Sequence, residues 1–279
     1  MYEVTNNTQY LDEFVQVIKQ NLGNPENEAL NGYVGTMGIS LELYERTKDP
    51  RWLQWDLNSF DKFIDTWQEF ESGVWGCEQN LYGRVYKHLG ATHGMFGNFG
   101  VMLKGIEHVS LVKKKMVLDR IESTTIKTAI TIDNLTNWPV SYATDYCMLQ
   151  WCHGAPGIIQ SLLEYKGKFS SEVDDLILQA GALIWESGPV LKGPSLCHGT
   201  IGNGQALFSI YQYNKNEKWL ERAQRLGMHT ITQIDTNKYS LWTGKMGVIE
   251  CLKNYFQIID GINFCYTKKW VCKTCRAKI

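Results

Sequence analysis

A Gly-x-x-Gly turn that recurs five times along the chain constrains the fold more than any other feature. Each turn precedes an apolar stretch, and the first glycines of the turns are Gly35, Gly94, Gly154, Gly199 and Gly244. Successive turns are separated by 59, 60, 45 and 45 residues. Such a recurrence is typical of repeat proteins, in which each unit buries its apolar face against the next. Glycine at the start of a helix permits the close approach that this stacking needs.

Between the turns, the apolar residues recur with the period of an amphipathic helix. Five segments carry such a stripe, namely residues 11–22, 51–70, 115–131, 172–185 and 219–234, whereas the stretches that directly follow the turns are apolar on more than one face. The sequence therefore predicts an all-α protein with an inner ring of buried helices and an outer ring of amphipathic ones, that is, an α/α toroid. A plain open helical-repeat scaffold would give a similar pattern.

Two of the glycine turns are preceded by a Cys-His dipeptide. Cys152-His153 stands in Trp-Cys-His-Gly-Ala-Pro-Gly, and Cys197-His198 stands in Leu-Cys-His-Gly-Thr-Ile-Gly. Thiolate and imidazole are ligands that zinc prefers. If the repeats curve into a toroid, all inner helices start at the same end of the molecule, and both dipeptides gather there with His93. The repeat thus predicts a metal site as well as a fold.

The remaining cysteines carry a weaker signal. Eight cysteines scattered through 279 residues, without a readable secretory signal, favour reduced thiols over a disulfide framework. Cys272 and Cys275 form a Cys-x-x-Cys near the C-terminus, but no second pair accompanies them. We therefore interpret residues 261–279 as a tail with incidental thiols.

Charge and hydropathy exclude several classes of function. The formal net charge is −1 and the basic residues are spread along the chain, which argues against a nucleic-acid surface or a polybasic membrane anchor. No apolar run approaches the roughly 18 residues that a membrane helix needs, and residues 1–9 are too polar for a signal peptide. We expect a cytoplasmic protein whose partners are small molecules or peptides.

The residues around the turns resemble the signature motifs of the lanthionine synthetase C-like family. Besides the two Cys-His segments and Thr92-His93-Gly94, the motifs of the plain bacterial-type members are matched by Leu81-Tyr82-Gly83-Arg84, Asn137-Trp138-Pro139 and Ser240-Leu241-Trp242-Thr243-Gly244. The similarity extends over roughly residues 27–256. It implies an α/α toroid of seven inner and seven outer helices that binds one zinc ion.

The resemblance also implies the chemistry of the site. It implies that Cys152, Cys197 and His198 are the three zinc ligands, and a fourth position left open is typical of catalytic rather than structural zinc. His93 matches a histidine of the family motif and is expected to be the catalytic acid or base. A lone histidine at a helix start is otherwise a capping or core residue.

Three further residues are expected to support these groups. His153 is expected to support the metal site by a hydrogen bond without binding the ion. Lys192 stands five residues before Cys197, where a lysine contacts glutathione in eukaryotic members, and would pair with a carboxylate of the thiol substrate. The other interpretation of Lys192 is a solvated loop lysine. Arg84 is a second candidate anion contact, on position alone.

The chain departs from the family in its number of repeats, since five of the seven are recognisable and the first two are absent. We interpret residues 1–26 as the outer helix and lead-in of a missing repeat, residues 27–260 as the toroid domain and residues 261–279 as the tail. An incomplete toroid exposes apolar flanks on its end helices. We therefore expect an open horseshoe, or a partner or missing segment that closes it. A family site residue that the missing repeats contribute, such as an acidic residue that assists catalysis in the bacterial cyclases, cannot be mapped on this chain.

Two hypotheses for function follow. The first is an enzyme that uses zinc to activate the thiol of glutathione or of a peptide cysteine for addition to a dehydroamino acid, which forms a thioether. The alternative is a non-catalytic protein that binds zinc together with glutathione or a peptide. The missing repeats favour the second hypothesis, and His93 favours the first.

Overall fold

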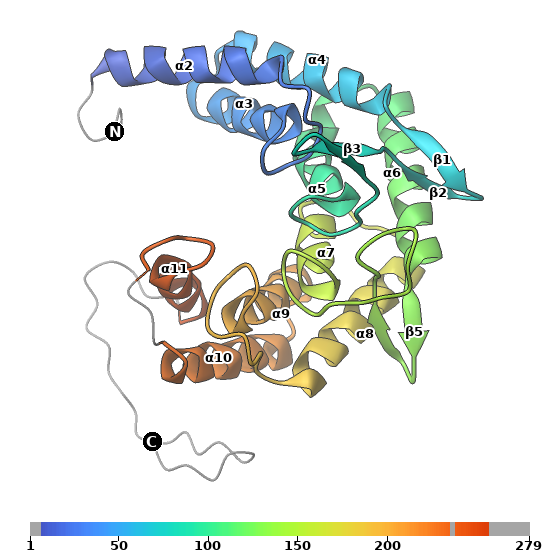
Figure 1. Ribbon diagram of the computed structural model, residues 1–279, viewed down its shortest axis with the longest axis vertical. Coiled ribbons are helices and arrows are strands. Elements are labelled where there is room, and N and C mark those ends of the chain that lie inside the picture. Colours follow the sequence, from blue (N-terminus) through green and yellow to red (C-terminus); the bar gives the residue numbers. More distant parts are fainter. Residues whose placement is uncertain (1–6, 235–237, 257–279) are drawn as a thin grey trace.

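The computed structural model describes residues 7–234 and 238–256, which form an open arc of helices with three short hairpins (Figure 1). The helices are α2 Thr8–Leu22, α3 Tyr33–Thr47, α4 Pro50–Ile64, α5 Met95–Gly105, α6 Leu111–Thr128, α7 Ala155–Leu162, α8 Ser171–Ser187, α9 Thr200–Asn214, α10 Glu217–Thr232 and α11 Lys245–Tyr255. A 3-10 turn, Ile106–His108, follows α5. None of the helices in this part of the chain has both the length and the apolar character needed to cross a membrane.

The helices form two layers (Figure 1). α3, α5, α7, α9 and α11 make the inner layer and contact one another in chain order, while α4, α6, α8 and α10 lie outside them and α2 packs on α3. α5 is buried along most of its length, whereas α10 buries a stripe that includes Trp219, Ala223 and Leu226. This contrast confirms the predicted all-α toroid with buried inner and amphipathic outer helices, here as five consecutive repeats.

The three hairpins are antiparallel and two-stranded. They pair β1 Gln68–Glu71 with β2 Val74–Gly76, β3 Gln79–Leu81 with β4 Arg84–Tyr86, and β5 Ile130–Ile132 with β6 Leu135–Asn137. The sequence pattern predicts one helix over residues 51–70, which is wrong in its last part because α4 ends at Ile64. Phe70 instead lies on β1, where its ring packs against Tyr142 with centroids 4.7 Å apart.

The first repeat starts three residues earlier than the sequence pattern predicts. The N-cap of α3 is Gly32 rather than Gly35, whereas the other four inner helices are capped by the predicted glycines. The fourth residue of each turn shows the true register. A Cβ there would lie 1.9–2.1 Å from the carbonyl oxygen six residues earlier, at Gly35, Gly97, Gly157, Gly202 and Gly247. Gly35 is therefore the last glycine of its turn, and only glycine fits where the chain returns this closely to the helix start.

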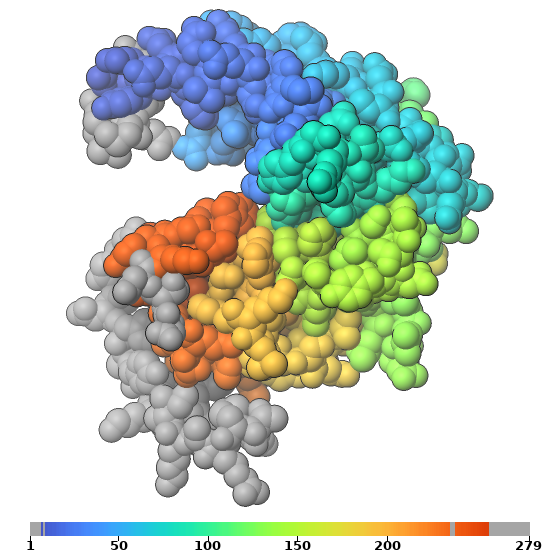
Figure 2. All heavy atoms as spheres, viewed as in Figure 1, coloured from blue at the N-terminus to red at the C-terminus, as the bar shows by residue number. Residues whose placement is uncertain are grey.

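The arc does not close within the described residues. Figure 2 shows open space between the end that carries α2 and α3 and the end that carries α11. Ile39 on α3 and Ile249 on α11 are 43% and 55% exposed, as an open horseshoe predicts. Residues 1–6 and 257–279 lie outside the described residues, so the tail with Cys272 and Cys275 and the proposed domain boundaries stay predictions.

Candidate metal centre

Backbone hydrogen bonds join the loops that precede the inner helices into a ladder. The amide of Thr92 donates to the carbonyl of Cys152 (3.5 Å), that of Cys152 to Cys197 (3.2 Å) and that of Cys197 to Trp242 (2.9 Å). Each of these residues stands two positions before the N-cap glycine of its inner helix. The ladder therefore brings equivalent positions of neighbouring repeats together, and with them the two cysteines of the Cys-His pairs.

Cys152, Cys197 and His198 form a compact cluster on this ladder. Their ligand atoms all lie within 4.8 Å of one another, and the Sγ of Cys152 is 3.7 Å from the Nδ1 of His198. Both cysteines are buried and His198 is exposed, so one side of the cluster faces solvent. Two sulfurs and one imidazole nitrogen are the donors that a catalytic zinc ion takes from a protein. The residues present therefore fit zinc.

The two thiols of the cluster shift each other's pKa in opposite directions. The Cys197 thiol donates to the Cys152 sulfur, which lowers the pKa of Cys152 to about 6 and raises the pKa of Cys197 far above its usual range. Burial raises both pKa values, whereas the charge of His198 and a hydrogen bond from Gln150 lower the pKa of Cys152 further. Zinc binds cysteine as a thiolate, so metal binding would release the thiol protons of both residues.

Gln150 and Lys192 extend the cluster beside Cys152. The Nε2 of Gln150 donates to the Sγ of Cys152 at 2.9 Å, and the Nζ of Lys192 donates to the Oε1 of Gln150 at 3.0 Å. Gln150 is buried and Lys192 is exposed. The structure thus places Lys192 one side chain away from the cluster, and its contact with a substrate carboxylate stays a prediction. Sequence reasoning missed Gln150, because a single glutamine carries no chemical signal of its own.

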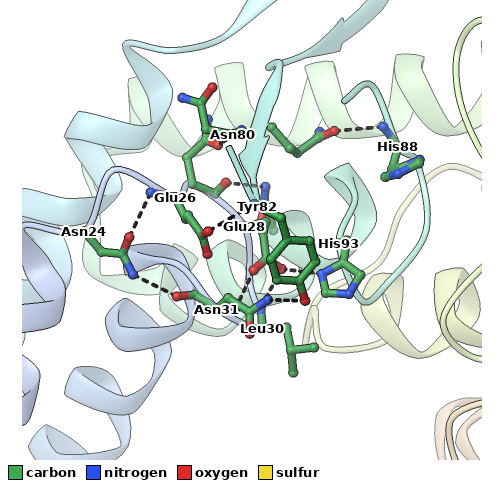
Figure 3. A network of polar contacts seen from close by, with 12 residues as sticks. Asn24, Glu26, Glu28, Leu30, Asn31, Asn80, Tyr82, His88 and His93 are labelled. Atoms are coloured by element: carbon green, nitrogen blue, oxygen red, sulfur yellow. Dashed lines mark hydrogen bonds and ion pairs between the residues drawn. The ribbon is translucent and has the colours of Figure 1, made fainter. Parts of the chain in front are cut away.

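His93 pairs with a buried carboxylate that sequence reasoning also missed. The Nδ1 of His93 lies 3.2 Å from the Oε2 of Glu28, whose side chain is fully buried, while 22% of the His93 side chain is exposed. Tyr82, in the turn of the β3–β4 hairpin, packs its ring edge-on against His93 with centroids 6.1 Å apart (Figure 3). When the carboxylate accepts the Nδ1 hydrogen, the Nε2 is left as the proton acceptor.

The loop before α3 fixes the Glu28 carboxylate. It accepts hydrogen bonds from the amides of Leu30 (2.8 Å) and Asn31, and the side chain of Asn31 donates to the Tyr82 hydroxyl (3.1 Å), as Figure 3 shows. Glu28 is not among the site residues that the sequence predicts, and its contact with His93 makes it an additional candidate. Glu28 stands four positions before Gly32, as Gln150 stands before Gly154, and this correspondence is visible only once Gly32 is known to be the N-cap of α3.

Two other predicted residues lie apart from these contacts. The Nδ1 of His153 is buried without a hydrogen-bond partner among the described residues, and burial lowers the pKa of His153 to about 4. Its ring packs edge-on against His88 with centroids 5.4 Å apart, so the expected supporting hydrogen bond of His153 stays a prediction. Arg84 is exposed on β4 and, within the described part of the chain, makes no hydrogen bond or ion pair with the other site residues.

Comparison with known proteins agrees with this architecture. The family model described as lanthionine synthetase C-like protein matches residues 2–260. Glutathione S-transferase LANCL1 of Danio rerio is 34% identical over 119 residues, which cover 39% of this chain and 29% of that protein. LanC-like protein GCL1 of Arabidopsis thaliana is 27% identical over 202 residues, which cover 68% of this chain and 41% of that protein. The solved structure of nisin cyclase superimposes on this chain with a TM-score of 0.62 and 13% sequence identity. The superposition covers 90% of this chain and 70% of the nisin cyclase chain, which shows a common fold.

Fold and cluster together define a helical toroid with a Cys-Cys-His site at the start of its inner helices. The chain belongs to the lanthionine synthetase C-like family, as its motifs predict. The aligned segments span 29% and 41% of the two curated relatives. We therefore assign an activity or substrate of those proteins to this chain only as a proposal.

Proposed function

We propose that this chain is a zinc-dependent enzyme of the cytoplasm that adds the thiol of glutathione or of a peptide cysteine to a dehydroamino acid, which forms a thioether. The observation that carries the proposal is the Cys152, Cys197 and His198 cluster, which lies on the same row of loops as a histidine backed by a buried carboxylate. The relative named as a glutathione S-transferase supports a thiol substrate.

The ligand residues and His93 would divide the chemistry. Zinc held by Cys152, Cys197 and His198 would stabilise the anionic form of a substrate thiol. The Nε2 of His93 would accept the thiol proton, since Glu28 accepts the Nδ1 hydrogen and stabilises the imidazolium. As the sulfur bonds to the β-carbon, the electron pair of the carbon–carbon double bond moves to the enolate. His93 then returns its proton to the α-carbon, so that the proton count balances.

Two exposed cations, Lys192 and Arg84, would bind the substrate's charged groups. Lys192 reaches the cluster from the loop before α9 and would pair with a carboxylate of glutathione or of a peptide. Arg84, on the β3–β4 hairpin that also carries Tyr82, would be a second anion contact. These roles predict that removal of Lys192 weakens substrate binding more than it slows the chemical step.

Metal content and product mass test the proposal. The purified protein should contain about one zinc per chain, a Cys197→Ala variant should lose it, and equal zinc in both would refute the ligand assignment. Incubation with glutathione and a dehydroalanine peptide should give an adduct whose mass is the sum of the two. A His93→Ala variant should keep its zinc and lose adduct formation. Binding of zinc and glutathione without any adduct would instead identify the non-catalytic binding protein.

A further inference from the structure

The hydrogen-bonded chain from Lys192 through Gln150 to Cys152 has a direction. The lysine ammonium donates to the amide oxygen, and the amide N–H donates to the sulfur, at 3.0 and 2.9 Å. An ammonium that polarises an amide oxygen makes the opposite N–H a stronger donor, because hydrogen bonds in a chain polarise one another. A hydrogen bond from that N–H stabilises negative charge on the sulfur. The two hydrogen bonds thus connect the charge of an exposed lysine to a buried sulfur.

The glutamine side chain is not needed to form its own turn. The backbone of Gln150 pairs with that of His153 in both directions at 3.2 Å, and this pairing holds the turn that presents Cys152. The Nε2 of Gln150 has one other, longer contact, to the Sδ of Met148 at 3.5 Å. The side chain is therefore available to act on the cysteine.

The equivalent position in other repeats does a different job. Four residues before the N-cap glycine, Glu28 accepts from amides of its own loop, Ser195 accepts from the His198 amide at 3.4 Å and Ser240 accepts from the Thr243 amide at 3.2 Å. Gln150 occupies this position in the third repeat, yet its amide donates to a sulfur rather than accepting from backbone. Among these positions, the one whose side chain donates to a sulfur is the one that lies beside Cys152. This indicates that the Gln150 side chain acts on Cys152.

We propose that Gln150 is a positioning residue that holds the Cys152 sulfur in its ligating orientation, and that Lys192 acts through Gln150 to strengthen this hold. The inference rests on the proposed zinc site and deepens it. Lys192 then serves the metal centre as well as the substrate. A substrate carboxylate that draws Lys192 away from Gln150 would weaken the hydrogen bond to Cys152 at the moment when the thiol is bound.

The test uses the full chain loaded with cobalt(II) in place of zinc. Gln150→Met has nearly the same volume and no N–H donor, and Lys192→Met removes an exposed charge without disturbing the core. The sulfur-to-cobalt charge-transfer band should move to longer wavelength in Gln150→Met, because a thiolate that accepts no hydrogen bond transfers an electron to the metal more readily. Affinity for zinc, measured against a chelating dye, should fall about tenfold, the usual effect of losing a group that supports a ligand. Gln179→Met, a glutamine on α8 that bonds Thr136, is the matched control.

The double variant decides whether Lys192 acts through Gln150. Lys192→Met alone should shift the band in the same direction by a smaller amount, and adding it to Gln150→Met should cause no further shift. Additive shifts would overturn the relay, and an unchanged band in Gln150→Met with cobalt bound would overturn the role of Gln150 while leaving the metal site intact. Failure of the parent protein to bind cobalt through cysteine would overturn both this inference and the proposed function.

Discussion

At the scale of single residues, the Glu28 carboxylate has the clearest consequence for activity. It is fully buried, and its partners are His93 and the amides of its own loop. A carboxylate that accepts the Nδ1 hydrogen of a histidine fixes the tautomer and stabilises the protonated ring. Glu28 would therefore determine which nitrogen of His93 exchanges a proton with the substrate.

Replacing Glu28 by Gln tests this assignment. Glutamine keeps one oxygen to accept from the loop amides but carries no charge to stabilise an imidazolium. Loss of a general acid–base group typically lowers the rate by about 100-fold. We expect His93→Ala to show this full decrease in the rate of adduct formation and Glu28→Gln to show a smaller decrease. The measurement is the rate of adduct formation at fixed zinc content. Equal rates in Glu28→Gln and the parent protein would remove Glu28 from the mechanism.

The burial of Asp56, which lies outside the metal centre, makes the free energy of unfolding depend on pH. Its side chain on α4 is 1% exposed, its Oδ2 has no hydrogen-bond partner among the described residues, and burial raises its pKa to about 7. At pH values between 3.8 and about 7, Asp56 is thus protonated in the folded state and ionised in the unfolded chain. Its contribution to stability is complete below the unfolded value of 3.8 and declines as the pH rises to about 7. A pKa that is one pH unit higher in the folded chain than in the unfolded chain corresponds to about 1.4 kcal/mol.

An Asp56→Asn variant should lose this dependence. The urea midpoint of the parent protein should fall relative to that of the variant as the pH rises from 3.8 to about 7, because the amide never ionises. Comparison of the two proteins at each pH cancels the other titrating groups. A difference in midpoint that does not change with pH would contradict the prediction.

The residues that could be predicted from sequence are those in motifs of fixed spacing. Cys152, Cys197 and His198 are a fixed distance from their N-cap glycines, so the repeat brings them together. Glu28 and Gln150 could not be predicted in the same way. Glu28 acts on a residue of the next repeat, and the register of its own repeat is hidden by the overlapping glycines Gly32, Gly35 and Gly38.

At the scale of elements, the turn glycines set how closely the inner helices pack. A Cβ on Gly157 would lie 1.9 Å from the carbonyl oxygen of Trp151 and 2.6 Å from the Cβ of Ala91 in the preceding repeat. The first of these is backbone of its own loop and cannot move aside without distorting the turn. Gly157 therefore fixes both the start of α7 and the distance to the neighbouring loop.

Gly157→Ala should destabilise the protein by about 1–3 kcal/mol or more, the range for overfilled sites. Gly23→Ala is the matched control, because the nearest atom to its added Cβ is the Gln20 oxygen at 3.6 Å and its φ of −88° suits alanine. Chemical denaturation of both variants gives the two free energies of unfolding. Similar values for the two would mean that the loop at Gly157 yields to the methyl group.

The helices could be predicted and the hairpins could not, for a physical reason. Helices of 15 or more residues, such as α4 and α8, show several turns of the apolar period. Strands of three or four residues, such as β1 and β3, are too short to show alternation. The β3–β4 turn also places Tyr82 in the left-handed region, with a φ of 51°, a conformation unusual for a residue other than glycine. The motif Leu81-Tyr82-Gly83-Arg84 could therefore be recognised in the sequence, but the hairpin that places Tyr82 at His93 could not.

At the scale of the whole molecule, the arc is stabilised by contacts between neighbouring repeats. α5, α7 and α9 each have an inner helix on both sides, whereas α2 packs on α3 at one end and α11 packs on α9 and α10 at the other. In proteins built this way, stability is close to a sum of repeat and interface terms. The middle of the arc should therefore be the most stable part.

Hydrogen exchange measures this gradient. Backbone amides of α5, α7 and α9 should exchange slowest, and those of α2 and α11 should exchange fastest, because end helices open at lower free-energy cost. The purified chain at neutral pH, digested after timed exposure to heavy water, gives protection for each helix. Uniform protection along the arc would show that it unfolds as a single cooperative unit.

The ladder through Thr92, Cys152, Cys197 and Trp242 has one more consequence. Each cysteine belongs to a different repeat, so no single repeat contains the site, which is a property of the joint between the third and fourth. Whole repeats could be gained or lost elsewhere in the arc during evolution without altering that joint. A lineage could thus lengthen or shorten its toroid, and reshape the surface that meets a substrate, while inheriting the metal centre unchanged.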